Sequence, residues 1–582
     1  MSRTLPTRPM RRFPPRRQGI VLFVVTVVIA ALTLGGLSLL ALMRVEREAT
    51  RQRLRDIELV NTARSAAVMT QALAGMTQDE RARFGGTYDN PALFRNRTIL
   101  PFADGGESAF TVLSPRLEST RGGVRYGLVN ESTRLNLGTL LDWDQEKPGT
   151  AKGILMKLPG MTSIMADSLL DWLDPDEETR PDGAELSYYA AHRMTYSPRN
   201  AVPVSLDEIL LVRGITRYQL YGLDTTYSYS GGETDRGKES DPAESAPIGS
   251  LRTTVANARG MRGGVVDVSD AAIETEVTIP WSRLLTVFSA EKDIDPDGRA
   301  KIDLNERDLS FLYDELDAAL GPRLAAFVIL CRQYGFTSDV AGPTVEAGEN
   351  DVDLTVPPRF TFQTPLDVVG VSVRAHDRVF TSPISAHRES VTELFRFLDY
   401  ASVGASAVIS GRINVNEAPR AVLELVPGLD AQAVTRILDS RPPPGQPIPK
   451  RQRHAAWLFA DGIVDLEQMK RLWGKLTTGG DVFRAQIVSF SETGGGYRRA
   501  EIVVDAAVIP PRQVFHKDLT MLGRGFSIDV LTRGTATGPS TATSRLDALV
   551  REQTTPDTPF GDLESLSPPA APFNAVEEML GP

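Results

Sequence analysis

The chain has 582 residues, which is too long for one compact domain, so about two to four domains are expected. Its formal net charge of −10 argues against a protein that holds nucleic acid through overall positive charge. A single cysteine, Cys331, excludes an internal disulfide and a zinc site built from thiolates. The histidines show no metal-binding spacing and no GxSxG motif is present, so no enzyme is expected.

The first predicted element is a membrane-spanning helix behind a basic leader. Six arginines and no acidic residue precede Gly19, and the 25 residues from Gly19 to Met43 carry no charge. As a helix they would span about 37 Å, enough to cross a hydrocarbon layer of ~30 Å and too long for an ordinary secretory signal. The arginines predict a cytoplasmic N-terminus and an exported remainder.

The same helix is predicted to continue beyond the membrane. From Met43 to Ala74 there is no proline and no glycine, and Leu54, Ile57, Val60, Ala63 and Ala67 recur every three or four residues. This spacing indicates one apolar stripe on a charged rod. We therefore expect one helix over 20–74, with 20–43 in the membrane; two separate helices are the alternative.

The leader of residues 1–19 resembles the class III leader of type IV pilins and type II secretion pseudopilins. The resemblance implies cleavage after Gly19 by a prepilin peptidase and methylation of the new first residue, Ile20. Most members have glutamate at the fifth mature position, where this chain has Val24. That departure is typical of the general secretion pathway protein K family, a minor pseudopilin at the tip of the filament.

A helical insertion is predicted over 131–225, after a pilin-like β region over 75–130. The stretch LMKLPGMTSIMADSLLDWL indicates a helix–hairpin–helix around Pro159 and Gly160, because proline fixes φ and glycine tolerates positive φ. A looser example surrounds Gly214. The block over 151–223 resembles the helical insertion of the protein K family.

An acidic loop follows the first hairpin. Positions 1, 3, 5, 9 and 12 of the loop have the ligand spacing of an EF-hand, and they are Asp174, Asp176, Glu178, Asp182 and Glu185. Position 6 is Thr179 rather than glycine, so the loop departs from an ordinary EF-hand. The family resemblance implies calcium here. The alternative is a solvated acidic loop without a metal.

A second helix–hairpin–helix unit is predicted over 411–475, around Pro427 and Gly428. Its lead-in, RINVN, is similar to RLNLG at 134–138 and to KIDLN at 301–305, as if one unit were reused. Between the two hairpin units we expect a linker over 226–250 and an additional β-rich or mixed insertion over 251–410. That insertion is either a duplicated module or a lineage-specific addition.

The C-terminal part is predicted to be sheet over 476–533. Two runs rich in Val and Ile flank a Gly-Gly-Gly turn at 494–496, which is typical of a β-hairpin. Residues 534–582, rich in Thr, Ser, Pro and Ala, are predicted to be disordered. The expected fold is α+β: a long pilin-type helix packed on an antiparallel sheet, with a large helical insertion.

The resemblance implies a minor pseudopilin at the tip of a type II secretion pseudopilus, supporting filament assembly and protein export across the outer membrane. The implied partners are the I-type and J-type minor pseudopilins, the major pseudopilin, the prepilin peptidase, the inner-membrane secretion platform and membrane lipid. The implied location is the bacterial inner membrane, as a single-pass protein with its bulk in the periplasm. The alternative is a membrane-anchored helix–hairpin–helix protein that binds DNA during uptake. Acidic residues beside both hairpins oppose phosphate binding, so no nucleic acid is expected.

Overall fold

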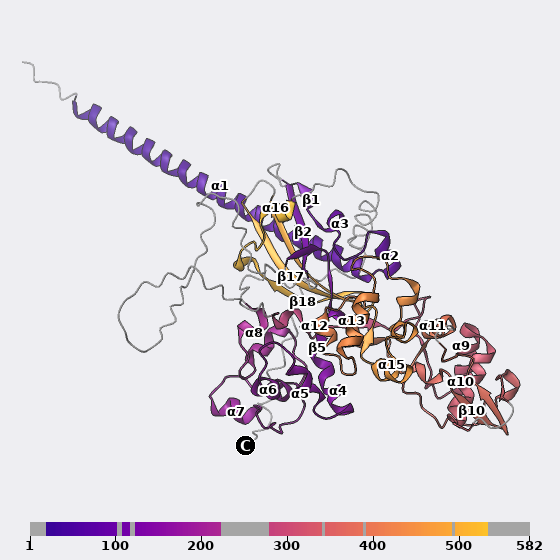
Figure 1. Cartoon of the computed structure of the whole chain (residues 1–582). Helices are drawn as coiled ribbons and strands as arrows, with labels where there is room; N and C mark the ends of the chain where they lie inside the picture. The colour runs from indigo at the N-terminus through magenta and orange to yellow at the C-terminus, as the bar shows by residue number, and fades with distance from the viewer. Residues whose placement is uncertain are drawn as a thin grey trace, which may run out of the picture.

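The computed structural model describes residues 19–101, 107–116, 123–222, 279–339, 344–387, 391–491 and 495–532. The leader up to residue 18, the predicted linker at 226–250 and the predicted disordered tail at 534–582 lie outside these ranges. Within them the protein consists of a long projecting helix, a sheet packed against that helix, and a broad helical part beyond the sheet (Figure 1).

Helix α1 (Gly19–Gly75) runs without a break for 57 residues, which confirms the single predicted helix. Its buried face differs from the predicted stripe, because Leu54 and Ile57 are exposed while Leu59, Thr62 and Met69 are buried. Threonine can lie on the buried face because its hydroxyl is satisfied: the Oγ1 of Thr62 donates to Glu58 O one turn back and lies 3.0 Å from the Oγ of Ser108 on β2 (Glu107–Pro115). The stripe predicted from apolar residues alone is therefore rotated about the helix axis relative to the face that is buried.

The sheet has seven strands in the order β1-β2-β16-β17-β18, with β3 paired to β2 and β4 paired to β16. Its pairs are antiparallel, and β16 and β17 form the predicted hairpin. The strands are β1 (Arg97–Pro101), β2 (Glu107–Pro115), β3 (Val124–Tyr126), β4 (Val129–Asn130), β16 (Val482–Ser491), β17 (Tyr497–Asp505) and β18 (Arg512–Asp518).

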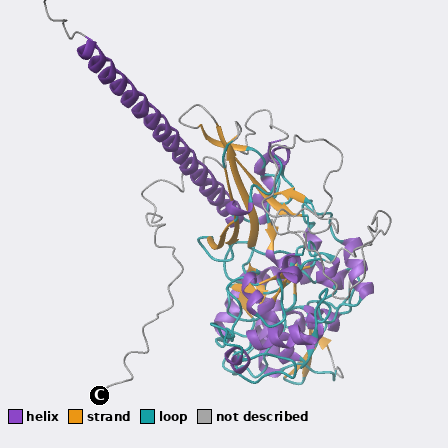
Figure 2. Ribbon diagram, turned by 90° about the vertical axis from the view of Figure 1, so that its left-hand side faces the viewer, coloured by secondary structure: helices purple, strands orange, loops and turns teal. Residues whose placement is uncertain are grey.

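The two faces of the sheet are covered by segments from opposite ends of the chain. Alternate residues, including Phe110, Ile487 and Ile502, pack with Met69 and Leu73 of α1. The other face packs against the C-terminal segment that contains α16 (Ile528–Thr532). Figure 2 shows this sheet beside the body-side half of α1. The short helices α2 (Gln78–Arg83) and α3 (Pro91–Phe94) connect α1 to β1.

The helical part is formed by the described residues between 131 and 477, which share one large apolar core. Its first segment contains η1 (Glu131–Thr133), β5 (Leu135–Asn136), η2 (Leu137–Thr139), α4 (Leu140–Glu146), α5 (Thr150–Leu155), α6 (Ser163–Leu173), α7 (Leu186–Ala191), η3 (Leu206–Leu211), α8 (Arg217–Tyr221), η4 (Trp281–Arg283) and β6 (Leu285–Thr286).

The predicted insertion over 251–410 is mixed in its described residues. It contains three helices of 10 to 13 residues and only short strands, so it is more helical than expected. The elements are β7 (Ala290–Lys292), β8 (Ile302–Asp303), α9 (Leu309–Leu320), α10 (Pro322–Tyr334), β9 (Thr344–Val345), η5 (Glu349–Asp351), η6 (Pro365–Val368), β10 (Ser372–Ala375), β11 (Arg378–Thr381), α11 (Val391–Tyr400), β12 (Ala401–Ser402) and β13 (Val408–Ser410).

The last helical segment leads back into the sheet. It contains β14 (Ile413–Asn414), α12 (Arg420–Leu423), α13 (Ala431–Ser440), η8 (Lys450–Gln452), α14 (Trp457–Ala460), α15 (Leu466–Leu472) and β15 (Leu476–Thr477). After β18, η9 (Thr520–Leu522) precedes α16. The helical part is thus inserted between β4 and β16, which pair with each other, and so it is anchored at one place on the sheet.

Candidate functional site: the projecting helix, the hairpins and the acidic loop

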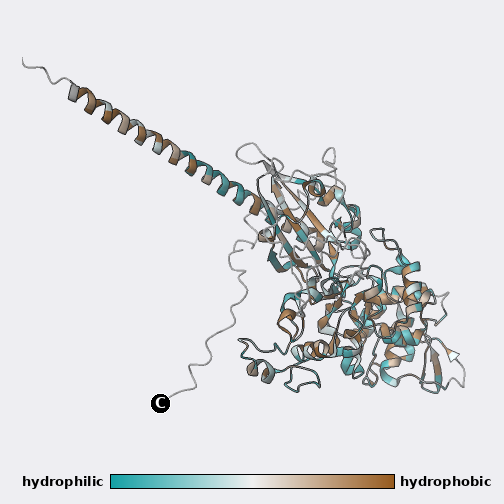
Figure 3. Ribbon diagram, turned by 60° about the vertical axis from the view of Figure 1, so that its left-hand side comes forward, coloured by the Kyte–Doolittle hydropathy of each residue, from teal (hydrophilic) through white to brown (hydrophobic). Residues whose placement is uncertain are grey.

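The N-terminal half of α1 is an apolar rod with no protein around it. Its large apolar side chains from Val21 to Met43 are exposed, and Figure 3 shows the change to hydrophilic residues before the helix reaches the body. The hydroxyls of Thr26, Thr33 and Ser38 donate to carbonyls one turn back, at 2.8, 2.8 and 2.9 Å. Every polar side chain in this stretch of α1 is thereby satisfied within the helix, as lipid requires. The helix is long and apolar enough to cross a membrane.

The predicted processing residues lie at the beginning of this helix. Gly19 and Ile20 are its first two residues, while the arginines before them are outside the described ranges. Val24 is 52% exposed, on a part of the helix that only lipid or another subunit can cover. The position that holds glutamate in most pilins therefore presents an apolar side chain here.

The first hairpin lies between α5 and α6. Gly160 has a φ of 69°, so the turn uses the left-handed region that favours glycine. The carbonyl of Pro159 accepts a hydrogen bond from the Nε1 of Trp281 at 2.9 Å. Gly214, the centre of the looser predicted hairpin, also has positive φ, at 83°, and packs beside Met165 of α6. Pro159 and Gly214 thus contact other elements of the helical part, and Gly160 supplies the positive φ of the turn.

The second hairpin lies between α12 and α13, opposite the first one. Gly428 follows Pro427 and has a φ of 99°. The Nζ of Lys157, beside the first turn, donates to the carbonyl of Glu424, just before the second turn, at 2.8 Å. The two hairpins line a shared cavity of about 370 Å³, with Pro159 on one side and Leu429 on the other. The hairpins face each other.

The acidic loop after α6 is organised around Arg180. Its guanidinium lies 2.8 Å from Asp171 on α6 and also pairs with Asp174, the residue that ends this helix. Asp171 is fully buried, and burial raises the pKa of Asp174 despite the ion pair. Gly183 is required here, because a Cβ at this position would lie 1.9 Å from the Oδ2 of Asp171.

Glu185 is the most unusual member of the loop. It is 2% exposed, and neither of its carboxylate oxygens has a hydrogen-bond partner among the described residues. Burial, together with the negative charges of Asp171 and Asp174, raises the pKa of Glu185 to about 7. A buried carboxylate without a donor calls for a proton or a cation.

The other three predicted ligands face elsewhere. The Oδ2 of Asp182 accepts a hydrogen bond from the Oγ of Ser163 at 2.6 Å, and Asp176 accepts one from the backbone of Glu178 at 2.8 Å. Glu178 is exposed. The five predicted residues do not converge as a ligand set, and no group of three or more possible ligands is close enough for a metal within the described residues. Two of the five fit a hard cation better, because Asp174 and Glu185 both have buried oxygens without a partner.

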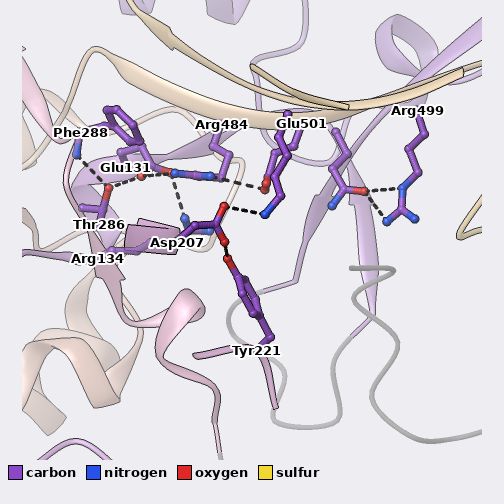
Figure 4. Close-up of polar contacts among 11 residues, drawn as sticks. Glu131, Arg134, Asp207, Tyr221, Thr286, Phe288, Arg484, Arg499 and Glu501 are labelled. Atoms are coloured by element: carbon purple, nitrogen blue, oxygen red, sulfur yellow. Dashed lines mark hydrogen bonds and ion pairs between the residues drawn. The ribbon is translucent and has the colours of Figure 1, made fainter. Parts of the chain in front are cut away.

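A buried ionic network joins the sheet to the helical part (Figure 4). Glu131, fully buried, lies 3.0 Å from the Nη1 of Arg134 and 2.8 Å from the Nε of Arg484 on β16. The hydroxyl of Thr286 on β6 also donates to Glu131. Burial opposes ionisation, but the charges of Arg484 and Arg134 outweigh it and lower the pKa of Glu131.

A second contact lies next to this network. Asp207 of η3 is 2.6 Å from the Nζ of Lys517 on the edge strand β18, and it accepts the hydroxyl of Tyr221. The helical part is thus attached to the sheet through charges on both β16 and β18. Neither contact was predicted, because each residue looks like an ordinary charge in the sequence. Asp167 and Asp171, four residues apart among the apolar side chains of α6, were the one visible signal of buried acids.

Comparisons with known proteins bear on the same region. Residues 133–224 match the family described as type II secretion system protein K. No curated protein sequence matches the chain. Among solved structures, the chain is similar to one in the crystal structure of the GspK-GspI-GspJ complex from the type 2 secretion system of enterotoxigenic Escherichia coli. The identity is 12%, over 82% of this chain and 98% of that chain, with a TM-score of 0.29.

The family match covers the first hairpin, the acidic loop and Gly214, which the sequence had singled out as the part most similar to protein K. It begins at Thr133, beside the buried Glu131 that joins the helical part to the sheet. Residues 133–224 are thus similar to protein K of type II secretion systems, and the chain also has a projecting apolar helix and an α+β fold.

Proposed function

We propose that this protein caps the tip of a type II secretion pseudopilus and supports filament assembly and protein export across the outer membrane. The observation behind this proposal is the exposed apolar half of α1, which continues into a half packed on the sheet. Lipid covers this surface before assembly, and the helices of neighbouring pseudopilins cover it afterwards. The role is assembly rather than catalysis.

The breadth of the helical part supports the tip position. Residues 131–477 form a body at the end of the molecule away from the start of α1 (Figure 1). Such a body leaves little room for another subunit's domain on the same side of the sheet. Val24 agrees with this, since a glutamate there would pair with the N-terminal amine of the subunit ahead, and a tip subunit has none ahead.

The N-terminus supplies the deciding experiment. We propose that the prepilin peptidase cuts after Gly19, leaving Ile20 as the first residue for methylation and α1 in the inner membrane with its start on the cytoplasmic side. N-terminal sequencing of the protein recovered from membranes should therefore begin at Ile20. A sequence that begins at Met1 would indicate a simple membrane anchor. A sequence that begins beyond Met43 would indicate a cleaved signal peptide, and either result would contradict the pseudopilin proposal.

The partners follow from the family. We propose the I-type and J-type minor pseudopilins as direct neighbours, with the major pseudopilin below them and the secretion platform in the inner membrane. Site-specific cross-linking from a residue on the free half of α1, such as Leu32, should capture pseudopilins. Cross-links to lipid alone in an assembling strain would contradict assembly through this helix.

The side chains around the hairpins support packing over DNA binding. The Nζ of Lys152 lies 2.8 Å from Asp167, and Lys157 is bonded to Glu424 O of the facing hairpin. Both lysines beside the first turn are therefore engaged within the protein. Asp430 caps α13 directly after the second turn and would repel phosphate.

Calcium at the acidic loop is part of the proposal. Asp174 and Glu185 would hold the ion through their unpartnered buried oxygens, with Asp171 beside them as a third negative charge. Bound calcium would neutralise this charge and keep the loop closed on α6. The melting midpoint should rise with calcium and fall with chelator in the wild type, and should respond much less in Glu185→Gln. Glu178→Gln is the matched control, because Glu178 is exposed.

A further inference from the structure

The helical part contains the same short strand pairing three times. Leu135 and Asn136 pair in parallel with Leu285 and Thr286, and Ile413 and Asn414 pair with Leu476 and Thr477. Between these two pairs, Ile302 and Asp303 pair with Ala401 and Ser402 in the same way. Each pairing joins the first and last residues of a helical segment, and each uses an aliphatic residue followed by Asn or Asp opposite a residue followed by Thr or Ser.

The beginning of each segment also has the same local geometry. The side-chain oxygen of the Asn or Asp accepts the backbone N–H two residues later, in Asn136 from Gly138, in Asp303 from Asn305 and in Asn414 from Asn416. The three distances are 2.9, 3.0 and 2.9 Å. This turn directs the chain out of the short strand and toward the first helices of the segment.

Two glycines with positive φ recur inside each segment. The first lies between the opening helices, at Gly160, Gly321 and Gly428, with φ of 69°, 97° and 99°. The second precedes an aliphatic residue in the later half of the segment, at Gly214, Gly370 and Gly462, with φ of 83°, 65° and 72°. Each segment then ends in a helix directly before its closing strand, at η4, α11 and α15. The order of features is therefore the same in all three.

A charged contact closes each of the three segments. The residue before the opening strand is basic in every case, and it pairs with a carboxylate that also accepts the hydroxyl of the closing Thr or Ser. The three sets are Arg134, Glu131 and Thr286; Lys301, Asp293 and Ser402; and Arg412, Glu291 and Thr477. The base–acid distances are 3.0, 3.3 and 3.2 Å.

The carboxylate in this contact comes from a different position in the sequence, relative to its basic partner, in each segment. Glu131 precedes its arginine by three residues, whereas Glu291 lies on β7 and comes from far upstream of Arg412. The contact is repeated although the spacing is not. A recurring contact built from different positions indicates that closing the segment at this point is needed for its stability.

The middle segment is inserted as a whole. Strand β7, just before it, pairs antiparallel with β13, just after it, and the N–H of Asp293 donates to the carbonyl of Ala407 at 2.9 Å. The two ends of residues 293–407 therefore lie side by side. A unit whose ends meet can be added to a fold without disturbing the strands on either side.

We infer that residues 293–407 form a third copy of the helical module, and that each copy is held shut by its own latch of base, carboxylate and hydroxyl. The three modules are residues 131–286, 293–402 and 412–477. Residues 403–407 then lead from the middle module to β13. Of the two readings of the insertion that the sequence left open, this is the duplicated module. The inference concerns local closure, so it stands independently of the tip function.

Hydrogen exchange on the full-length protein in detergent tests this inference. Asp293→Asn removes the charge that holds Lys301 and should speed amide exchange about tenfold within 302–402, with 135–222, 413–477 and the sheet unchanged. Glu291→Gln should do the same within 413–477 alone. Asp314→Asn, an exposed carboxylate on α9 in the same module, is the matched control and should change nothing.

A second variant tests the hydroxyl contact of the latch without changing any charge. Ser402→Ala keeps Asp293 and Lys301 but removes the hydroxyl, and should speed exchange in the same residues by a smaller factor. If Asp293→Asn speeds exchange equally in all three modules, they open as one unit and the inference is overturned. It is also overturned if neither variant changes exchange in 302–402.

Discussion

The Nε of Arg484 on β16 lies 2.8 Å from the Oε1 of Glu131, a residue 353 positions earlier that opens the helical part. Glu131 is fully buried and also pairs with Arg134, so one carboxylate contacts two guanidinium groups, and Arg484 in addition lies 3.5 Å from Glu501. This contact fixes the helical part to the central strand of the sheet on which α1 packs. The orientation of the broad body relative to α1 therefore depends on it.

Glu131→Gln tests this dependence. It removes the carboxylate that Arg134 and Arg484 share, while Arg484 keeps Glu501 at 3.5 Å, and removing one partner of a buried pair costs up to about 3–5 kcal/mol. The pKa of Glu131 is lowered in the folded state, so its contribution is present above the unfolded pKa of about 4.3 and is lost as the pH falls through the lower folded value. Urea unfolding at pH 7 should show the loss, with the exposed Glu315→Gln on α9 as control. An unchanged midpoint would show that the network does not hold the junction.

Glu185 gives the opposite pH dependence. Its folded pKa of about 7 lies above the unfolded value, so its contribution is fully present below pH ~4.3 and is lost as the pH rises through 7. The loss amounts to at most about 4 kcal/mol. In chelator, the wild type should weaken between pH 5 and 7.5, and Glu185→Gln should remove that part of the slope. If stability depends on pH in the same way in the wild type and in Glu185→Gln, then ionisation of Glu185 does not destabilise the folded protein.

Gly183 gives a test of the acidic loop by size alone. A Cβ there would lie 1.9 Å from the buried Asp171, so Gly183→Ala must push the loop away from α6 and should cost about 1–3 kcal/mol. Gly153→Ala is the matched control, because a Cβ at that helical position meets nothing within 4 Å and should be neutral or slightly stabilising. Thermal melts of both variants decide the question. Equal midpoints would indicate a loop that moves freely.

The sequence predicted those parts of the fold that depend on neighbouring residues. The unbroken helix from Gly19, the hairpin turn at Gly160 and the β16–β17 hairpin each follow from local periodicity or from a turn residue. The buried face of α1 was less predictable, because Thr62 lies on it and threonine looks polar until its hydroxyl finds a carbonyl.

The acidic loop shows the limit more sharply. EF-hand spacing selected five carboxylates, but the structure places Arg180 between Asp171 and Asp174 and turns Asp182 toward Ser163. The spacing of carboxylates along a loop does not determine where their side chains point. Here Asp171 of the buried helix α6 binds Arg180 and so changes the arrangement of the loop. The pairing of Glu131 with Arg484 has no local signal either, since it exists only once the sheet has closed around the inserted helical part.

The end of the described chain depends on another buried arginine. Arg499 on β17 is 1% exposed, donates to the Oε1 of Gln486 at 2.8 and 3.0 Å, and lies 5.0 Å from the ring centre of Phe526. Arg499→Met leaves the fully buried Gln486 without this donor and weakens the hold on residues 519–531. Trypsin should then cut at Arg524 several times faster. Arg512→Met, on the exposed edge strand, is the control, and equal cutting rates would show that Arg499 does not retain this segment.

Val24 offers the most direct test of the tip position. Val24→Glu places a carboxylate in the lipid-exposed part of α1, which costs up to about 3 kcal/mol unless a partner neutralises it. In a filament interior that partner is the N-terminal amine of the subunit ahead, and a tip subunit lacks one. The variant should therefore accumulate less in membranes and support less secretion than Val24→Leu, which keeps the helix apolar. Val24→Glu can match the wild type only if the new carboxylate pairs with the N-terminal amine of a subunit ahead. Equal membrane levels and equal secretion would therefore place the protein behind another subunit and contradict the tip position.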